Sequence, residues 1–191
     1  MKDRMSRAIE DHRALVGALA ERQLDVLQAA ADLLVACLRE GGKVLLCGNG
    51  GSAADAQHIA GELVGRFQRE RKALAAIALT TDTSVMTAWA NDYDFEGVFA
   101  RQVEGLLRAG DVLWAFSTSG RSANVLAAAE RARSMGGRIL AFSGRPGRPL
   151  EGLADVCLAV ETDCTARVQE VHQLAYHILC DLVETALSTN D

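Results

Sequence analysis

Short apolar runs alternate with longer segments of helical periodicity along most of this chain. Residues 44–47, for example, are all apolar, which is typical of a strand buried on both faces of a parallel sheet. The pattern predicts five strands, at residues 44–47, 74–80, 112–116, 138–142 and 156–160. Because helices are expected between successive strands, we predict an α/β fold whose parallel sheet is covered by helices on both faces.

The predicted helices differ in length, and the longest comes before the first strand. They are expected at residues 3–40, 53–66, 84–91, 95–107, 122–135 and 168–187. The first is rich in leucine and alanine, and Gly41 and Gly42 end it. So much helix exceeds what one small sheet needs, so it either covers the sheet or packs against another subunit. We therefore expect residues 1–40 to contribute to an oligomer interface.

Length and composition favour one domain spanning residues 1–191. Hydrophobic residues make up 49% of the chain, enough for a sizeable core, and only two prolines occur. The net charge of −5 argues against a nucleic-acid-binding surface. A charged N-terminus and the lack of any apolar run of bilayer length predict a cytoplasmic protein that does not enter membranes. The five cysteines form no C-x-x-C pair and are expected to be reduced and mostly buried.

A glycine-rich turn follows the first predicted strand and leads into a helix. Gly48, Gly50 and Gly51 allow tight backbone turns and close approach of a ligand. The free N–H groups of the helix start, the helix dipole and the Ser52 hydroxyl form a ready site for an anion or a polyhydroxy ligand. The same glycines fit a loose dinucleotide-binding pattern, which requires an acidic residue about twenty positions later. Asp82, after the second predicted strand, comes too late for that role.

His58 and Glu62 lie one turn apart in the helix that follows this loop. At positions i and i+4 they share a helix face and can both bind one cation. For an arbitrary histidine and glutamate, however, a hydrogen-bonded surface pair is the more common arrangement. The sequence therefore gives two interpretations of this pair, a metal site and an ordinary surface contact.

A second polar loop follows the third predicted strand. Ser117, Thr118, Ser119 and Ser122 surround a glycine just before a predicted helix. Four hydroxyls and the N–H groups of a helix start suit a phosphate monoester, whereas a single serine would indicate only an ordinary helix cap. In a sheet of strand order 2-1-3-4-5, the loops after strands 1 and 3 flank the switch point where ligands bind. Both polar loops are expected to meet there.

The last predicted helix carries another candidate, His177. Gln169, Gln173 and His177 lie along one slowly drifting stripe of this helix, whereas His172 points away from it. His177 is therefore the better candidate for an active histidine, although a lone helix histidine most often has a structural role. Eight residues span about 12 Å of helix, so Gln169 and His177 can share one ion only if Gln169 sits at the helix start or the helix is distorted.

Several motifs together resemble one known family over nearly the whole chain. They are CGNGGSAADAQHIAGE at residues 47–62, ANDY at 90–93, STSGRS at 117–122, and RVQE at 167–170 with His177. With these motifs the chain resembles the SIS domain family and, within it, the sedoheptulose-7-phosphate isomerases, also called phosphoheptose isomerases. Arg121 departs from the family pattern, because relatives often carry asparagine there.

The resemblance implies a set of functional residues. One zinc ion per subunit would be bound by His58, Glu62, Gln169 and His177. The implied substrate contacts are Asn49, Gly50, Gly51, Ser52, Glu62, Asn91, Asp92, Ser117, Thr118, Ser119, Ser122 and Gln169. The family forms homotetramers with sites at subunit interfaces, which would suit the long N-terminal helices.

The implied reaction interconverts sedoheptulose 7-phosphate and D-glycero-D-manno-heptose 7-phosphate, the first step in making nucleotide-activated heptoses. It moves a proton between C1 and C2 through an enediol, and the resemblance gives Glu62 and His177 this task. The alternative is a non-catalytic SIS protein that binds a sugar phosphate or associates with a replication initiator. The complete set of His58, Glu62, Gln169 and His177 favours the enzyme, because a pure binding module has no chemical need for all four.

Overall fold

The computed structural model describes residues 1–188. Its centre is a five-stranded parallel sheet with the order β2-β1-β3-β4-β5. The strands are β1 (Val44–Cys47), β2 (Ala76–Ala78), β3 (Val112–Ser117), β4 (Arg138–Ser143) and β5 (Val156–Ala159). All four pairs of neighbouring strands are parallel. The predicted α/β fold and the strand order 2-1-3-4-5 are confirmed.

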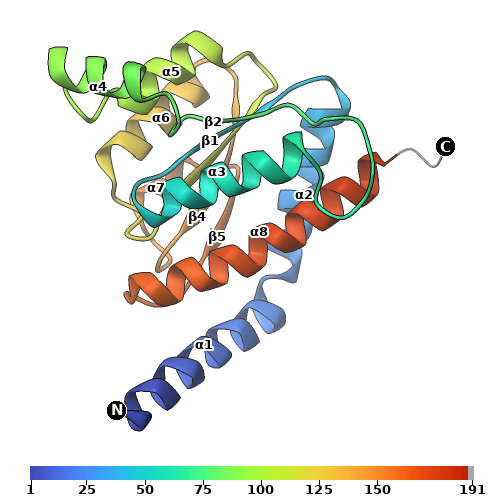
Figure 1. Ribbon diagram of the computed structural model, residues 1–191, viewed down its shortest axis with the longest axis vertical. Coiled ribbons are helices and arrows are strands. Elements are labelled where there is room, and N and C mark those ends of the chain that lie inside the picture. The colour runs from blue at the N-terminus through green and yellow to red at the C-terminus, as the bar shows by residue number, and fades with distance from the viewer. Residues whose placement is uncertain (189–191) are drawn as a thin grey trace.

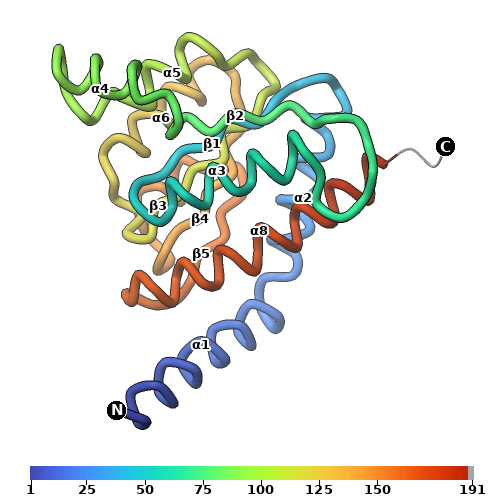
Figure 2. The backbone as a smooth tube through the Cα atoms, in the orientation of Figure 1, coloured from blue at the N-terminus to red at the C-terminus, as the bar shows by residue number. Residues whose placement is uncertain are grey.

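Helices cover both faces of the sheet, because alternate strand side chains enter two separate cores (Figures 1 and 2). One core contains Trp114, Phe116 and Phe142, and the other contains Leu113 and Ala115. The first face is covered by α2 (Leu24–Arg39), α3 (Gly51–Val64) and α8 (Thr165–Leu187). The second is covered by α5 (Val98–Leu106), α6 (Ala123–Ser134) and α7 (Pro149–Leu153). This arrangement places α3 and α8 side by side.

The N-terminal segment forms two helices instead of one continuous helix. Helix α1 (Lys2–Arg22) ends and α2 begins at Gln23, whose φ of −127° and ψ of 14° are not helical. The Gln23 side chain donates from Nε2 to the carbonyl oxygen of Ala159 over 2.6 Å. This contact with the end of β5 ties the break to the sheet. Helix α1 packs against α8 and projects from the body of the molecule, as Figure 1 shows.

Several predicted boundaries differ from the structure. The strand expected at residues 74–80 is only three residues long, because β2 is an edge strand paired on one side alone. Helix α4 (Thr83–Asp92) begins after Asp82, which accepts a hydrogen bond from the Val85 N–H. Helix α5 begins at Val98, three residues later than expected, and α8 begins three residues earlier, at Thr165. Helix α7, which starts with Pro149, was not predicted.

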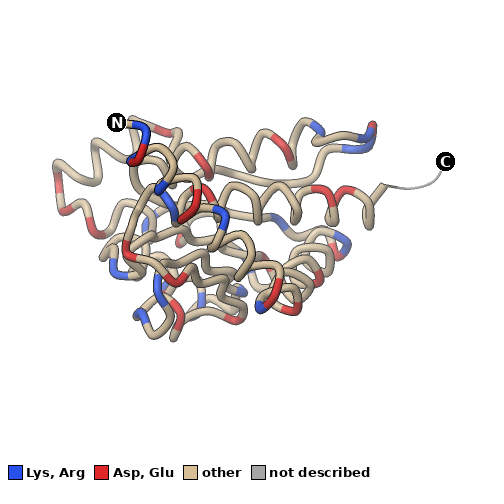
Figure 3. Tube along the Cα trace, turned by 90° about the horizontal axis from the view of Figure 1, so that it is seen from below, with Lys and Arg blue, Asp and Glu red and all other residues tan. Residues whose placement is uncertain are grey.

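Charged residues of both signs are interspersed along the helices in the view of Figure 3. All five cysteines are free thiols, and Cys37, Cys47 and Cys180 are buried as expected. Within residues 1–188, no helix combines the length and the apolar character needed to cross a membrane.

Candidate functional site

The glycine-rich loop between β1 and α3 brings its backbone close to a side chain of α8. Gly50 has a φ of +56° and a ψ of −120°, a conformation that residues with a Cβ rarely adopt. Gly51 opens α3, and a Cβ at this position would lie 2.3 Å from Nε2 of Gln169. Glycine at position 51 therefore allows the Gln169 amide to lie directly against the start of α3.

A cluster of hydroxyls forms the loop after β3. Ser117 Oγ lies 2.9 Å from Ser122 Oγ and 3.3 Å from Ser119 Oγ. The Arg121 N–H donates to Ser119 Oγ over 3.2 Å. Helix α6 begins directly after Ser122, so the free N–H groups of its first turn face the same loop. The loop thus gathers hydroxyl and N–H donors around one point.

Two asparagines connect this loop region to the glycine-rich loop. Asn49 Nδ2 donates to Asn124 Oδ1 over 2.8 Å, and Asn124 Nδ2 donates to Asn49 Oδ1 over 2.9 Å. Asn124 lies in the first turn of α6 and is 4% exposed. Because each amide donates one hydrogen bond to the other and accepts one from it, the pair fixes the two loops in relation to one another.

The two loops and the start of α8 border a cavity of about 270 Å³. Its lining residues are Asn49, Gly50, Gly51, Ser52, Phe116, Ser117, Thr118, Ser122, Thr165 and Gln169. Strands β1 and β3 are neighbours in the sheet, so the cavity lies at the switch point, where ligands bind in such folds. The predicted meeting of the two polar loops is confirmed.

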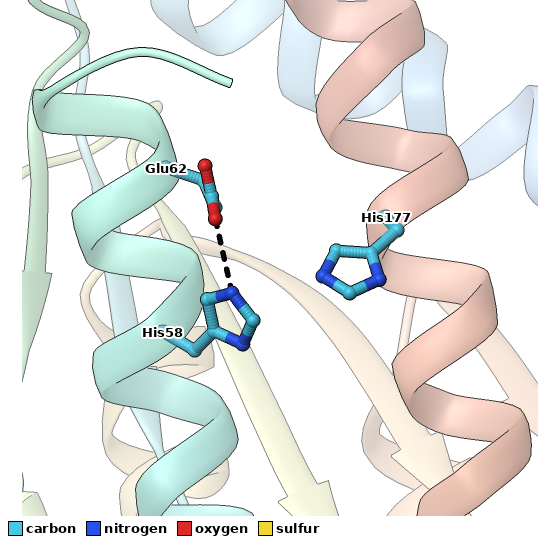
Figure 4. A group of neighbouring side chains, drawn as sticks. All are labelled: His58, Glu62 and His177. Atoms are coloured by element: carbon cyan, nitrogen blue, oxygen red, sulfur yellow. Dashed lines mark hydrogen bonds and ion pairs between the residues drawn. The ribbon is translucent and has the colours of Figure 1, made fainter. Parts of the chain in front are cut away.

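A second group of polar side chains lies further along α3 and α8. His58 Nε2 is 2.9 Å from Glu62 Oε1, and His177 faces this pair from α8 (Figure 4). The rings of His58 and His177 meet edge to face, with centroids 5.1 Å apart. One donor atom from each of the three side chains lies within 4.8 Å of the others. The three residues form what we call the His–Glu–His cluster.

The surroundings of His177 favour its neutral form. Burial lowers the pKa of His177, and the neighbouring His58 lowers it further, while Glu62 opposes the shift. The ring of Phe67 stacks on the His177 imidazole, with centroids 5.8 Å apart and an angle of 23° between the planes. A neutral imidazole can accept a proton or bind a cation, which are the two roles expected for His177.

The His–Glu–His cluster fits a divalent cation in its chemistry and its spacing. Two imidazoles and a carboxylate are the usual ligands of zinc in catalytic sites. Zinc bonds of about 2.0–2.1 Å place tetrahedral ligand atoms roughly 3.4 Å apart. The three donor atoms lie within 4.8 Å of one another, close to that spacing. Side chains from two different helices thus meet as a metal site requires, which an isolated surface pair on α3 would not do.

Comparison with known proteins decides the family. The SIS domain family matches residues 9–144. A phosphoheptose isomerase from Helicobacter hepaticus is 55% identical over 86% of this chain and 84% of its own length. The chain belongs to the phosphoheptose isomerase family of SIS domain proteins. The solved phosphoheptose isomerase from Neisseria gonorrhoeae is 42% identical and superimposes with a TM-score of 0.91, covering 96% of this chain and 98% of that one. The solved phosphoheptose isomerase from Francisella tularensis is 38% identical and superimposes with a TM-score of 0.92, covering 96% of this chain and 97% of that one.

Not every expected site residue of this family member lies in the cavity or the cluster. Gln169 is the fifth residue of the uninterrupted helix α8 and borders the cavity with its amide against Gly51, two helical turns before His177. It could join the three other ligands only if its side chain turned away from Gly51, and its role as a fourth metal ligand stays a prediction. Asn91 and Asp92 are exposed on α4 and hydrogen bond to each other over 2.9 Å. Ser119 is exposed at the rim of the hydroxyl cluster. His172 points away as expected, since it is buried and its Nε2 lies 3.1 Å from the Ser143 carbonyl oxygen.

Three residues that support the site were not predicted from the sequence. Asn124 pairs with Asn49, Phe67 stacks on His177, and the hydroxyl of Tyr176 lies 3.0 Å from His58 Nδ1. Tyr176 is adjacent to His177 in sequence, yet helical geometry alone would point it elsewhere. In each case the two partners are far apart along the chain, so no local sequence pattern predicts the contact.

Proposed function

We propose that this chain is an aldose–ketose isomerase that interconverts sedoheptulose 7-phosphate and D-glycero-D-manno-heptose 7-phosphate through an enediol. The observation that carries the proposal is the apposition of His58 and Glu62 with His177 across two helices, beside a cavity rich in hydroxyl and N–H donors. The names of the similar proteins supply the class of substrate, a phosphoheptose, and the type of reaction, an isomerisation.

The dimensions of the site suit a long sugar phosphate. His58 in the cluster lies seven positions after Gly51 at the cavity, which is about 10 Å along α3. Eight bonds of about 1.5 Å join C1 of a heptose 7-phosphate to its phosphorus and span roughly 10 Å when extended. The phosphate would therefore bind among Ser117, Ser119 and Ser122 while C1 and C2 lie near the cluster.

Within the cluster, Glu62 and His177 are the groups that can move the proton. We assign Glu62 as the base that removes the proton from C1 of the ketose, and His177 as its partner at the oxygens of C1 and C2. The lowered pKa of His177 keeps its imidazole neutral, so it can take up or return a proton during turnover. Phe67 covers the imidazole on one side and limits the access of water.

A zinc ion, one per subunit, is the cofactor we propose, held by His58, Glu62 and His177 with Gln169 as the fourth ligand. When bound, it would polarise the sugar oxygens at C1 and C2 and so acidify the C1 proton. A donor atom bound to zinc cannot take up a proton at the same time, so Glu62 and His177 would bind the ion loosely or exchange roles during turnover. The Asn49, Ser52 and Thr118 side chains would orient the hydroxyls of the sugar between the phosphate and the reacting carbons.

We further propose a homotetramer in which exposed α4 of one subunit supplies Asn91 and Asp92 to the site of another. Met1, which caps α1, and Met5 and Ile9 within it follow one another at intervals of four residues and are 94%, 59% and 67% exposed, so they offer an apolar stripe for such contacts. Light scattering at micromolar concentration should give the mass of a tetramer, and a monomer would contradict the assembly. The five free thiols suit a reducing compartment, which supports a cytoplasmic enzyme.

Purified protein should convert sedoheptulose 7-phosphate to the aldose. A chelator should abolish the activity, and zinc should restore it. His177→Ala should lose turnover and bind zinc less tightly. If no aldose forms under any of these conditions while the sugar phosphate still binds, the chain is the non-catalytic SIS protein that the sequence left as the alternative.

A further inference from the structure

Tyr176 lies behind His58, on the side opposite Glu62. Its side chain is fully buried, and its hydroxyl oxygen is 3.0 Å from His58 Nδ1. The same hydroxyl lies 3.5 Å from Asp55 Oδ1, a long hydrogen bond. Asp55, His58 and Glu62 occupy positions i, i+3 and i+7 of α3, so all three share one face of that helix. A line of polar contacts therefore leads from Asp55 through Tyr176 and His58 to Glu62.

The direction of these hydrogen bonds follows from the chemistry of the groups. An ionised carboxylate can only accept, and a phenol keeps its single proton at neutral pH. Tyr176 therefore donates its proton to Asp55 and offers a lone pair to His58. The proton between Tyr176 and His58 must then come from the imidazole, which places it on Nδ1. The lone pair of the neutral imidazole is consequently on Nε2, the nitrogen that faces Glu62.

Burial raises the pKa of Asp55, and the hydrogen bond from Tyr176 opposes that shift by stabilising the ionised form. Its second oxygen, Oδ2, is buried and has no hydrogen-bond partner within residues 1–188. Tyr176 is the donor that the structure gives to this carboxylate. A buried carboxylate oxygen without a donor is costly to keep, and Asp55 stands only three residues before His58.

We propose that Tyr176 and Asp55 are positioning residues, which hold His58 in the tautomer with its proton on Nδ1 and its Nε2 lone pair directed into the His–Glu–His cluster. The inference rests on the proposed metal site. In that tautomer His58 Nε2 and Glu62 Oε1, which lie 2.9 Å apart, both present lone pairs, so a cation can take the place of the proton that otherwise joins them. Tyr176 and Asp55 thus prepare His58 to bind a cation. In the same way, hydrogen bonds from the residues around a metal site orient the histidines that bind the metal.

The variant that tests this is Tyr176→Phe, which keeps the ring and removes the hydroxyl. Competition with a chromophoric chelator should show zinc binding about 10- to 100-fold weaker than in the wild type, the usual effect of losing such a contact. Tyr93→Phe removes the hydroxyl of the other tyrosine, which is 69% exposed, and should leave zinc affinity unchanged. Asp55→Asn, which keeps an acceptor but removes the charge, should cause a smaller loss than Tyr176→Phe.

A second measurement separates positioning from a general loss of packing. Long-range ¹H–¹⁵N spectra of the metal-free protein report the tautomer of each of its four histidines. The wild type should show His58 protonated on Nδ1, and Tyr176→Phe should lose this preference while the signals of buried His172 stay unchanged. Should Tyr176→Phe fail to fold, Asp55→Asn gives the same two measurements.

Wild-type zinc affinity together with an unchanged His58 tautomer in Tyr176→Phe would overturn the proposal. If the wild type itself neither binds zinc nor isomerises the sugar, the proposed function fails. The tautomer of His58 in wild type and Tyr176→Phe then still decides the positioning role, because that measurement needs no metal and no substrate.

Discussion

Replacing Glu184 with glutamine removes the anchor of the loop that carries Phe67 over His177. Glu184 lies on α8 and is 1% exposed. Its two carboxylate oxygens accept hydrogen bonds from the N–H groups of Phe67, Gln68 and Arg69, over 2.8, 2.6 and 2.8 Å. Arg71, whose side chain is 3% exposed, places Nε 3.2 Å from Glu184 Oε1. One buried carboxylate therefore holds three consecutive backbone groups and one buried cation.

The cost of Glu184→Gln can be worked from these contacts. Glutamine presents one oxygen and one NH₂ group, so at least one loop N–H would face another donor. Arg71 would lose its counter-charge inside the protein. Removing one partner of a buried ion pair costs about 3–5 kcal/mol. For a chain of this size, about 2–4 °C of melting temperature correspond to each kcal/mol, so the melting temperature should fall by roughly 6–20 °C.

Thermal unfolding followed by circular dichroism, at one fixed protein concentration, measures this difference. The matched control is Asp181→Asn, also an acid-to-amide change on α8. Asp181 pairs with Arg69 over 3.1 Å, but its side chain is 46% exposed. An exposed pair contributes less than about 1 kcal/mol, so the control should melt close to the wild type.

The pH dependence gives a second test of the same contacts. Burial alone would raise the pKa of Glu184, but the N–H groups of Gln68, Phe67 and Arg69, with Arg71, outweigh it and lower the pKa. A lowered pKa means that the carboxylate stabilises the fold above the unfolded-state value of about 4.3. This contribution is lost as the pH falls through the folded-state pKa. The difference in melting temperature between the wild type and Glu184→Gln should therefore be constant near neutral pH and become smaller in acid.

Either of two results would refute this reasoning. If Glu184→Gln lowered the melting temperature no more than Asp181→Asn does, the Glu184 carboxylate would not be the anchor of the loop. If the difference in melting temperature between the wild type and Glu184→Gln stayed the same below pH 4, the charge of Glu184 would not be what stabilises the contacts.

Two further changes test the cavity. Gly51→Ala should leave the melting temperature unchanged or slightly higher, since φ at this position is not positive and alanine lowers the entropy of the unfolded chain. Its Cβ should nevertheless displace the Gln169 amide and weaken substrate binding in calorimetry. Wild-type affinity in that variant would contradict the close contact. Ser119→Ala combined with Ser122→Ala should raise KM more than it lowers kcat, because these hydroxyls hold a phosphate far from the reacting carbons. A loss confined to kcat in steady-state kinetics would refute that placement.

The sheet and the cavity could be predicted from the sequence because their signals are local. A parallel strand buried on both faces, such as β1, leaves an uninterrupted apolar run. The glycines and hydroxyls that follow β1 and β3 stand next to those runs. The order of the strands then places both loops at one edge of the sheet, so sequence spacing was enough to bring Ser52 and Ser117 together.

The contacts that support the site depend on tertiary structure. The break at Gln23 carries neither glycine nor proline, and it is tied to Ala159, 136 residues away. Tyr176 reaches His58 across 118 residues, and Glu184 reaches Phe67 across 117. The last two contacts follow from the packing of α8 against α3 and the loop after it, and the first follows from the packing of the N-terminal helix α2 against β5. Hydrophobic periodicity specifies neither.

Proton exchange at C1 of the sugar tests the central claim, that Glu62 in the His–Glu–His cluster moves the proton of an isomerase. Sedoheptulose 7-phosphate in deuterated water is followed by NMR with the wild type, with Glu62→Gln, and with Glu70→Gln, which changes an acid that is 90% exposed on the loop after α3. The wild type and Glu70→Gln should exchange the C1 proton at similar rates. Glu62→Gln should be slower by about 10²- to 10⁴-fold, the usual contribution of a positioned base. Exchange at the wild-type rate in Glu62→Gln would contradict the account, because another group would then remove the proton.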